Sequence, residues 1–362
     1  MNARLDRRLI VGAVVGLAGC LTGLLIDPRA MLAAYLVAWN ALAAIAIGAL
    51  AILLITYLVR AGWTQDLHDP LAGAALTLPM TAILFLPILI GADALFPWAH
   101  DPTTLTRFKA IYLTPTFFAL RAVVYFMVWT GLAIWATRTY RQGRDTRPVA
   151  AIGLIVWALA ASWAGVDWFE SIEPHFHSSI YGLLIVSFDL AAGFSFGLLM
   201  LLGVKRGQAM SNSAYAGVLL SVLLLWAYLH AMQYIIIWAG NIPDEVIWYQ
   251  ARTTSGWGIP LAALFAIQFV VPFFLLLSAR LRANSRFLLR LAGFTLACRY
   301  LEAALLIVPP LHLSPLATTF GFGAAVLATT CIWLLALIVA IRRLPGRTAE
   351  RLAAADQDQS PD

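Results

Sequence analysis

The sequence predicts an all-α integral membrane protein of about ten transmembrane helices, with both termini in the cytoplasm. Of its 362 residues, 62% are apolar and 12% are charged, where an average soluble domain has roughly 45–50% and about 25%. Ten continuously apolar stretches are long enough to cross the roughly 30 Å of hydrocarbon in a bilayer. Because these stretches do not alternate between apolar and polar residues, they indicate helices and exclude a β-barrel.

The ten expected helices follow one another with short connections. They cover residues 9–26, 32–59, 71–98, 113–137, 149–168, 180–204, 214–238, 257–278, 287–308 and 316–341. The first has basic flanks like a signal peptide, but it runs into Asp27 and Pro28 without a small-residue cleavage pattern, so we expect it to be retained. We expect residues 1–343 to form one polytopic transmembrane domain, followed by a disordered cytoplasmic tail over 344–362.

The orientation follows from the Lys and Arg residues outside the expected helices. Seventeen lie in alternate connections and at the two ends, and only four lie in the remaining connections. The larger set is Arg4, Arg7, Arg8, Arg60, Arg138, Arg141, Arg144, Arg147, Lys205, Arg206, Arg280, Arg282, Arg286, Arg342, Arg343, Arg347 and Arg351, and the smaller is Arg29, Arg107, Lys109 and Arg252. Since cytoplasmic loops carry the excess of positive charge, both termini are expected in the cytoplasm.

The chain offers few ligands for a redox centre of its own. Cys20, Cys298 and Cys331 lie singly inside apolar runs, so no zinc or iron–sulfur ligand set is expected. Only His230 lies deep in an expected helix, which excludes a haem held by two such histidines. We therefore expect no metal and no covalently bound cofactor. No basic run of the nucleic-acid-binding type is present.

Ionisable side chains within expected helices are candidate functional residues, because they are costly to place in lipid. Counting 1.5 Å per residue places the main candidates roughly 10–13 Å below the outer surface, in four different helices. They are Arg121, Asp189, His230, Arg299 and Glu302. We expect them to share one pocket, with Arg299 and Glu302 paired at i, i+3. The group is either an ion-pair network that fixes helix register or a hydrated cavity that handles protons or binds a polar headgroup.

Neighbouring residues bear on that choice. Gln233 and Tyr234 follow His230 by one turn, which favours a polar cavity. Gly193 and Gly197 follow Asp189 and favour close helix packing. Pro260 and Pro272 interrupt the eighth expected helix on either side of Gln268, so this helix is either kinked or broken around a cavity. No ionisable residue is expected in the inner half of any helix away from its end, so a proton route across the whole membrane is not expected.

The outer loop between the fifth and sixth helices concentrates titratable groups. Asp167, Glu170, Glu173, His175 and His177 fall within eleven residues that contain no Lys or Arg. Such groups suit a proton exit or a partner-docking surface, and a solvated loop or a metal site are the alternatives. Two histidines at i, i+2 are a weak signature for a metal.

Several short motifs together resemble the NrfD/PsrC-like membrane subunits of alternative complex III, of the ActF type. The motifs are ALRAVVY at 119–125, SIEPH at 171–175, SSIYG at 178–182, LWAY at 225–228, QY at 233–234, IW at 237–238, NIPDE at 241–245 and FVVP at 269–272. They span most of residues 110–310. The resemblance implies ten helices arranged as two four-helix bundles with one peripheral helix at each chain end. His177 stands where the family usually has an aromatic residue.

The resemblance also implies a function. It implies a non-haem subunit of a quinol-oxidising electron-transfer complex in the bacterial inner membrane, with haem c subunits, iron–sulfur subunits and a sister NrfD-like subunit as partners. By matching position, a role in proton conduction or quinol binding is implied for Arg121, Asp167, Glu173, His175, Asp189, His230, Arg299 and Glu302. A secondary transporter and a purely structural anchor subunit are the alternatives, and both accommodate buried charges.

Overall fold

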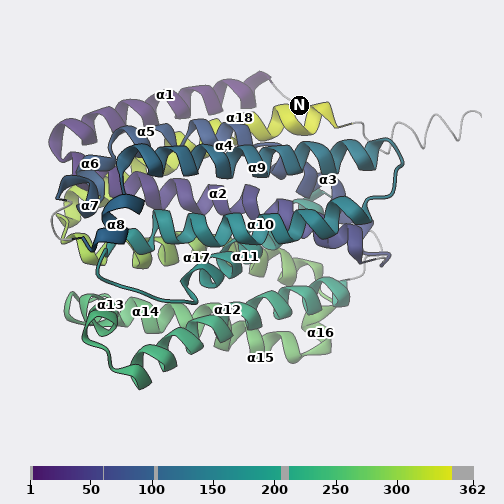
Figure 1. Cartoon of the computed structure of the whole chain (residues 1–362). Coiled ribbons are helices and arrows are strands. Elements are labelled where there is room, and N and C mark those ends of the chain that lie inside the picture. Colours follow the sequence, from purple (N-terminus) through teal and green to yellow (C-terminus); the bar gives the residue numbers. More distant parts are fainter. Residues whose placement is uncertain (1–2, 60, 102–104, 205–211, 345–362) are drawn as a thin grey trace, which may run out of the picture.

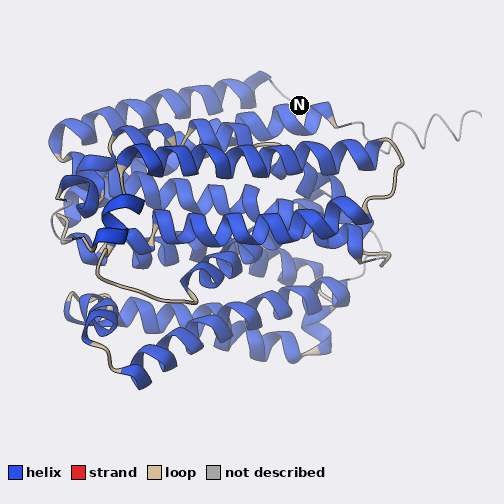
Figure 2. Ribbon diagram, viewed as in Figure 1, coloured by secondary structure: helices blue, strands red, loops and turns tan. Residues whose placement is uncertain are grey.

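The structure is a computed structural model that describes residues 3–59, 61–101, 105–204 and 212–344. Within these ranges every regular element is a helix (Figure 2), and ten helical spans are long and apolar enough to cross a membrane, as predicted. The predicted tail, apart from Leu344, lies outside the described residues.

The spans are formed by the following helices. Six spans are single helices: α1 (Ala3–Ile26), α2 (Pro28–Leu58), α9 (Pro115–Arg141), α11 (Tyr181–Val204), α12 (Asn212–Gly240) and α18 (Pro315–Arg343). The ninth span is α17 (Ser285–Ile307) with η4 (Pro309–Leu311). The fifth is α10 (Arg147–Trp168) with η2 (Glu170–Ile172), and the eighth is α14 (Gly258–Phe265), η3 (Ala266–Val270) and α15 (Val271–Leu277). Short helices fill connections: α6 (Ala92–Leu95), α7 (Pro97–His100), α8 (Arg107–Tyr112), α13 (Pro243–Thr254) and α16 (Ala279–Arg282).

The third span differs from the prediction of 71–98. It covers Thr64–Ile90 and is divided into α3 (Thr64–Ala75), α4 (Leu78–Ile83) and α5 (Leu86–Ile90). Pro79 and Pro87 each stand near the start of a new segment. Because proline lacks the backbone N–H that continues a helix, each one ends the hydrogen-bond ladder of the segment before it. The span begins seven residues, or about two turns, before the position that hydropathy indicated and ends eight residues earlier.

Helix α2 forms the centre of the molecule. Nearly all its side chains from Ala30 to Leu54 are buried, and it packs against α3, α10, α11, α17 and α18. Together with α3–α5, α9 and α10 it makes the first four-helix bundle, and α11, α12, α14–α15 and α17 make the second. Helices α1 and α18 pack on each other outside the bundles, and Figure 1 shows them on the side opposite α12–α16. This is the expected arrangement.

The two bundles meet where α2 and α11 touch backbone to backbone. A Cβ on Gly48 would lie 1.7 Å from the carbonyl oxygen of Asp189, and one on Gly193 would lie 2.1 Å from the carbonyl carbon of Gly48. Gly197 likewise packs against Leu71 of α3, 2.9 Å from its hypothetical Cβ. Glycine lets two helix backbones approach this closely, so Gly193 and Gly197 serve packing.

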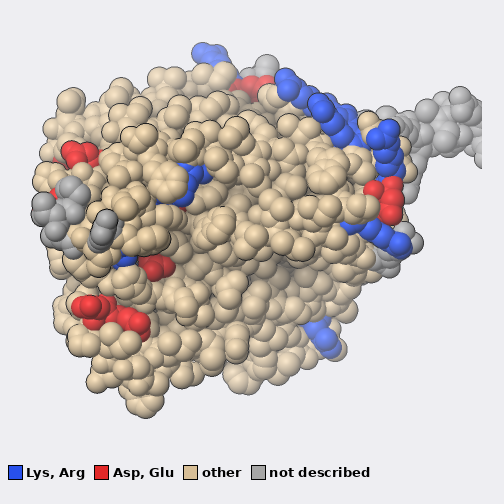
Figure 3. Space-filling view, viewed as in Figure 1, with Lys and Arg blue, Asp and Glu red and all other residues tan. Residues whose placement is uncertain are grey.

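The start of α1 and the end of α18 lie at the same end of the bundle. Arg342 Nη2 and Asp6 Oδ2 form an ion pair there, 3.3 Å apart. On the face shown in Figure 3, most Lys and Arg side chains gather towards this end, which we call the basic end. Its assignment to the cytoplasm stays a prediction from the positive-inside rule.

Candidate functional site

The five candidates predicted to share one pocket do not come together. Arg121 belongs to α9 in the first bundle, whereas His230, Arg299 and Glu302 belong to α12 and α17 in the second. Within the described residues, no hydrogen bond or ion pair joins Arg121 or Asp189 to the other three. The expectation of one shared pocket is therefore wrong. The depth of a residue along its helix does not reveal which neighbour that helix faces.

Arg121 forms a saturated network with Asp167 at the outer end of the first bundle. Its Nε and Nη2 donate to the two carboxylate oxygens at 2.7 and 3.0 Å, and Tyr125 donates a third hydrogen bond to Asp167 at 2.7 Å. The remaining Nη1 donates to the carbonyl of Tyr112, whose ring lies 3.8 Å below the guanidinium. A bidentate pair with every donor nitrogen engaged holds α8, α9 and α10 together, which is a structural role.

Glu173 of the outer loop pairs with Arg252, which the sequence indicated only as an outer-side charge. Arg252 is fully buried, and both Nη atoms lie 3.1 Å from Glu173 Oε2. It also donates to the carbonyls of Trp248, Leu305 and Leu306. Burial raises the pKa of Glu173 and lowers that of Arg252, and their mutual attraction opposes both shifts. The pair ties the outer loop to α13 and to the end of α17.

The third group joins His230, Glu302 and Arg299 in the second bundle. Arg299 Nη1 lies 2.5 Å from Glu302 Oε2, which confirms the predicted i, i+3 pair. Glu302 Oε1 accepts a hydrogen bond from Trp226 Nε1 at 2.8 Å and lies 3.2 Å from His230 Nε2. Arg299 is fully buried and Glu302 is 1% exposed. Charge neutralisation within the group allows it to be held away from water.

The contact between His230 and Glu302 defines where protons lie. His230 Nδ1 lies 2.9 Å from the carbonyl oxygen of Trp226. Because a carbonyl oxygen only accepts, Nδ1 carries a proton, and the opposite nitrogen Nε2 of a neutral ring bears a lone pair. In the neutral ring, Nε2 therefore has no proton to donate to the Glu302 carboxylate. A hydrogen bond forms between Nε2 and Oε1 only when an additional proton is bound to one of these two atoms.

A large apolar cavity reaches this pair. Its volume is about 670 Å³, and its walls come from α12, α13 and α14. Its polar groups are few and include His230, Gln233 and Asn241, while Trp226, Trp238 and Trp248 contribute aromatic walls. Sequence reasoning indicated His230 and Gln233 but not the contribution of α13, whose amphipathic residues look like an ordinary surface helix.

A polar path leads from this cavity to the outer loop. Gln233 Oε1 accepts a hydrogen bond from Ser178 Oγ at 3.1 Å, and the backbone N–H of Ser178 donates to Glu170 Oε1 at 3.3 Å. Gln233 Nε2 and the hydroxyl of Tyr181 are buried without a hydrogen-bond partner among the described residues. Tyr181 lies within electrostatic reach of Glu302, Glu173 and Glu170. Water molecules are the usual partners of such buried atoms.

The two loop histidines do not join these networks. His175 and His177 are exposed, and burial of part of the ring lowers the pKa of His177. Lys109 instead reaches this loop, where its Nζ donates to the carbonyl of Pro174. In the described part of the chain, no group of three or more His, Cys, Asp or Glu side chains is placed to hold a metal ion.

Asp189 lies deeper than the sequence arithmetic placed it. Its carbonyl oxygen touches Gly48, which lies twenty residues after Pro28 and ten before Leu58, or about 30 Å and 15 Å along α2. Measured along α2, Asp189 therefore lies nearer the basic end, although it is the ninth of the 24 residues of α11 and so stays in the outer half of its own helix. Helix α11 begins below the outer loop, which shifts all its residues inward. The carboxyl forms no hydrogen bond or ion pair with a described side chain.

The eighth span stays helical from Gly258 to Leu277, so it is not broken, and a π-helical segment marks the kink that was one of the two expectations. A five-residue π-helix, η3, separates α14 from α15 and ends two residues before Pro272. Gln268 within it is fully buried, and neither of its amide atoms has a hydrogen-bond partner among the described residues. Single π-helical turns often occur at functional sites.

A cluster at the basic end was missed by sequence reasoning, which gave His68 no weight. Tyr57 and His68 hydrogen-bond at 3.1 Å, and His68 Nδ1 lies 2.8 Å from Asp69 Oδ1. Tyr140 stacks on His68 with ring centroids 3.7 Å apart. The one sequence feature that could have indicated this cluster is the histidine next to an aspartate near the start of α3. The aromatic partners of His68 come from α2 and α9, which are far away in the sequence.

Compared with protein-family models and with curated proteins, the sequence shows no match. The resemblance to the NrfD/PsrC-like subunits therefore stays a prediction from the quoted motifs. The site itself is defined by geometry. Of the eight predicted residues, the structure places His230, Arg299 and Glu302 in one network, Arg121 with Asp167 in another and Glu173 with Arg252 in a third.

Proposed function

We propose that this chain is a non-haem subunit of a quinol-oxidising complex of the bacterial inner membrane, related to alternative complex III, and that it binds quinol beside His230. The observation that carries the proposal is the 670 Å³ apolar cavity lined by His230, whose Nε2 lies 3.2 Å from the buried Glu302 carboxylate. An apolar pocket with a few convergent polar groups is the usual form of a small-molecule site.

The cavity matches a quinol in size and chemistry. Pockets for small ligands measure about 300–1,000 Å³. A quinol has a flat ring, two hydroxyl groups and an apolar tail, and the aromatic side chains of Trp226, Trp248 and Tyr249 offer flat apolar surfaces for the ring. His230 offers a nitrogen to one hydroxyl group. Cavity residues of α12 and α14 offer the apolar contacts that the tail requires.

Oxidising a quinol to a quinone releases two protons and two electrons. In this proposal Nε2 of His230 takes the two protons one after the other: the first when the pair with Glu302 holds no extra proton, and the second after the first has been passed on. Glu302 and the Trp226 carbonyl keep the ring oriented, and Arg299 pairs with the Glu302 carboxylate. The two electrons would go to haem c and iron–sulfur centres, which we assign to partner subunits beside a sister NrfD-like subunit.

The released proton leaves by the polar path towards the outer loop. Gln233 and Ser178 connect the cavity to Glu170, and the hydroxyl of Tyr181 lies near the same acidic groups. Release towards the outer side matches the predicted position of this loop on the side with few basic residues. Arg121 and Asp167 are saturated with hydrogen bonds and take no part in this path.

Purification from native membranes tests the proposal. An affinity-tagged chain is expected to carry haem c and iron–sulfur spectra with it, and membranes lacking the chain are expected to lose quinol-dependent cytochrome reduction that the wild-type chain restores. Isolation of the chain alone, together with unchanged quinol oxidation after its removal, would contradict the proposal.

A secondary transporter is the second candidate, and the π-helical segment within the eighth span favours it. Transporters use interrupted helices to line substrate sites, and η3 with the unpartnered Gln268 fits that pattern. This candidate predicts that the chain purifies without redox-active partners and that Gln268→Leu alters solute uptake into proteoliposomes without any change in quinol oxidation.

A further inference from the structure

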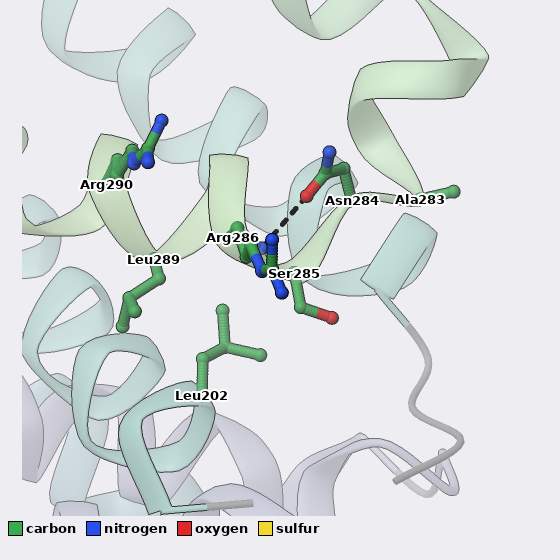
Figure 4. A pocket seen from close by; sticks show the side chains of 7 residues that line it. All are labelled: Leu202, Ala283, Asn284, Ser285, Arg286, Leu289 and Arg290. Carbon is green, nitrogen blue, oxygen red and sulfur yellow. Dashed lines mark hydrogen bonds between the residues drawn. The ribbon is translucent and has the colours of Figure 1, made fainter. Parts of the chain in front are cut away.

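A second, differently built hollow lies at the basic end, between the end of α11 and the start of α17. Its volume is about 840 Å³, and Figure 4 shows Leu202 of α11 pointing towards Ser285, Arg286 and Leu289 of α17, with Arg290 one turn further along α17. Nothing in the quinol proposal involves it, because the quinol cavity lies among α12, α13 and α14.

The wall formed by α17 is held in place by hydrogen bonds. Asn212 Nδ2 at the start of α12 donates to the carbonyl of Ala283 at 2.9 Å and to Ser285 Oγ at 2.7 Å. Asn284 Oδ1 caps α17 by accepting the backbone N–H groups of Arg286 and Phe287 at 3.0 and 3.1 Å. These first amides are thus engaged within the chain, so positive charge in the hollow comes from side chains.

Two guanidinium groups supply that charge. Arg286 and Arg290 line the hollow from successive turns of α17 and are both exposed. Neither forms an ion pair or side-chain hydrogen bond with a described residue, in contrast to Arg121, Arg252 and Arg299, which are each paired with a carboxylate. Two like charges one turn apart repel each other, so an anion between them removes an unfavourable interaction.

We propose that this hollow binds the phosphate headgroup of an anionic phospholipid. Guanidinium groups bind phosphate oxygens in pairs, and basic pockets between transmembrane helices at the cytoplasmic side bind such headgroups. Leu202 and Leu289 provide apolar surface next to the two charges, as a lipid with acyl chains requires and a free phosphate ion does not. Charge complementarity and this apolar wall together favour the lipid.

Native mass spectrometry of the detergent-purified protein, with whatever subunits accompany it, tests the proposal. The wild type is expected to retain cardiolipin or phosphatidylglycerol in preference to phosphatidylcholine. The double variant Arg286→Gln/Arg290→Gln is expected to bind the anionic lipids about tenfold more weakly, and Arg286→Lys/Arg290→Lys is expected to keep part of the binding because it keeps the charge.

The matched control is Arg7→Gln/Arg8→Gln, which removes two exposed charges at the same end of the bundle, on α1 and away from the hollow. It is expected to leave lipid retention unchanged. Equal loss in both double variants, retention of phosphatidylcholine to the same extent, or displacement of the lipid by millimolar inorganic phosphate would overturn the proposal. None of these results would affect the quinol proposal.

Discussion

His230 and Glu302 lie with Nε2 and Oε1 3.2 Å apart while the Trp226 indole donates to the same carboxylate oxygen. Trp226 is the donor to this oxygen, Arg299 forms an ion pair with the other oxygen, and His230 Nε2 donates to the carboxylate only when it carries a second ring proton. The histidine is the only member of this network that also lines the cavity with a titratable group. In the function proposed above, it passes a proton between a quinol in the cavity and the buried Glu302 carboxylate.

Removing either member of this pair should abolish most of the activity. We expect His230→Gln and Glu302→Gln each to lower the turnover of quinol oxidation by about 100-fold, the usual contribution of a general base. Because the two act as one unit, the double variant should lose little more than either single variant. Asp244→Asn, an exposed acid of α13, is the control. If stopped-flow assays showed that the losses of the two single variants multiply in the double variant, His230 and Glu302 would have independent roles.

The Arg121–Asp167 pair should matter for stability and not for turnover. We expect Asp167→Asn to lower the free energy of unfolding by about 3–5 kcal/mol, because it leaves a buried guanidinium without its partner. Arg121→Met/Asp167→Leu should recover part of that loss, since it removes both charges. Thermal denaturation in detergent measures both. Loss of proton release in the restabilised double variant would show that this pair conducts protons after all.

Arg252 should hold the outer loop against α13. In Arg252→Gln the buried Glu173 carboxylate loses two hydrogen bonds and three carbonyls lose a donor. We expect hydrogen exchange of residues 169–180 to rise by at least about tenfold. Arg29→Gln, an exposed arginine of α2, should leave that exchange unchanged. Unchanged protection of the loop in Arg252→Gln would show that other contacts fix it.

Glycine at the α2–α11 contact should be indispensable. A Cβ at position 193 would overlap the backbone of Gly48 and Ala49 at 2.1 and 2.3 Å, and neither backbone is free to move. We expect Gly193→Ala to lower the unfolding free energy by about 3 kcal/mol or to prevent folding. Gly217→Ala in α12, where no atom lies within 4 Å of the added Cβ, is expected to be neutral. Equal melting temperatures of the two variants would contradict the observed contact.

The fold was largely predictable because hydropathy and charge act locally. Nine spans agree with the sequence to within a few residues, and the third does not because Pro79 and Pro87 reset the helix within an apolar run. The alternation of basic and non-basic connections predicted that the start of α1 and the end of α18 lie on the same side of the helix bundle. The ion pair between Arg342 and Asp6 confirms this.

The site was predictable only where partners lie on one helix. The Arg299–Glu302 pair follows from i, i+3 spacing. By contrast, the pairing of Arg121 with Asp167 depends on how α9 and α10 rotate about their axes, which depth alone does not fix. Asp189 was misplaced because α11 begins below the surface, behind a packed outer loop. The walls of the cavity depend on α13, which no membrane-span pattern indicates.

Photolabelling tests the central claim most directly. Azido derivatives of ubiquinone and menaquinone are bound to the purified complex, activated by light and located by mass spectrometry. We expect the label on residues 226–241 and on α13 or α14. The amount of label should be lower in His230→Gln, and unlabelled quinol should compete with it. Labels confined to partner subunits, or labels on this chain that no quinol displaces, would contradict it.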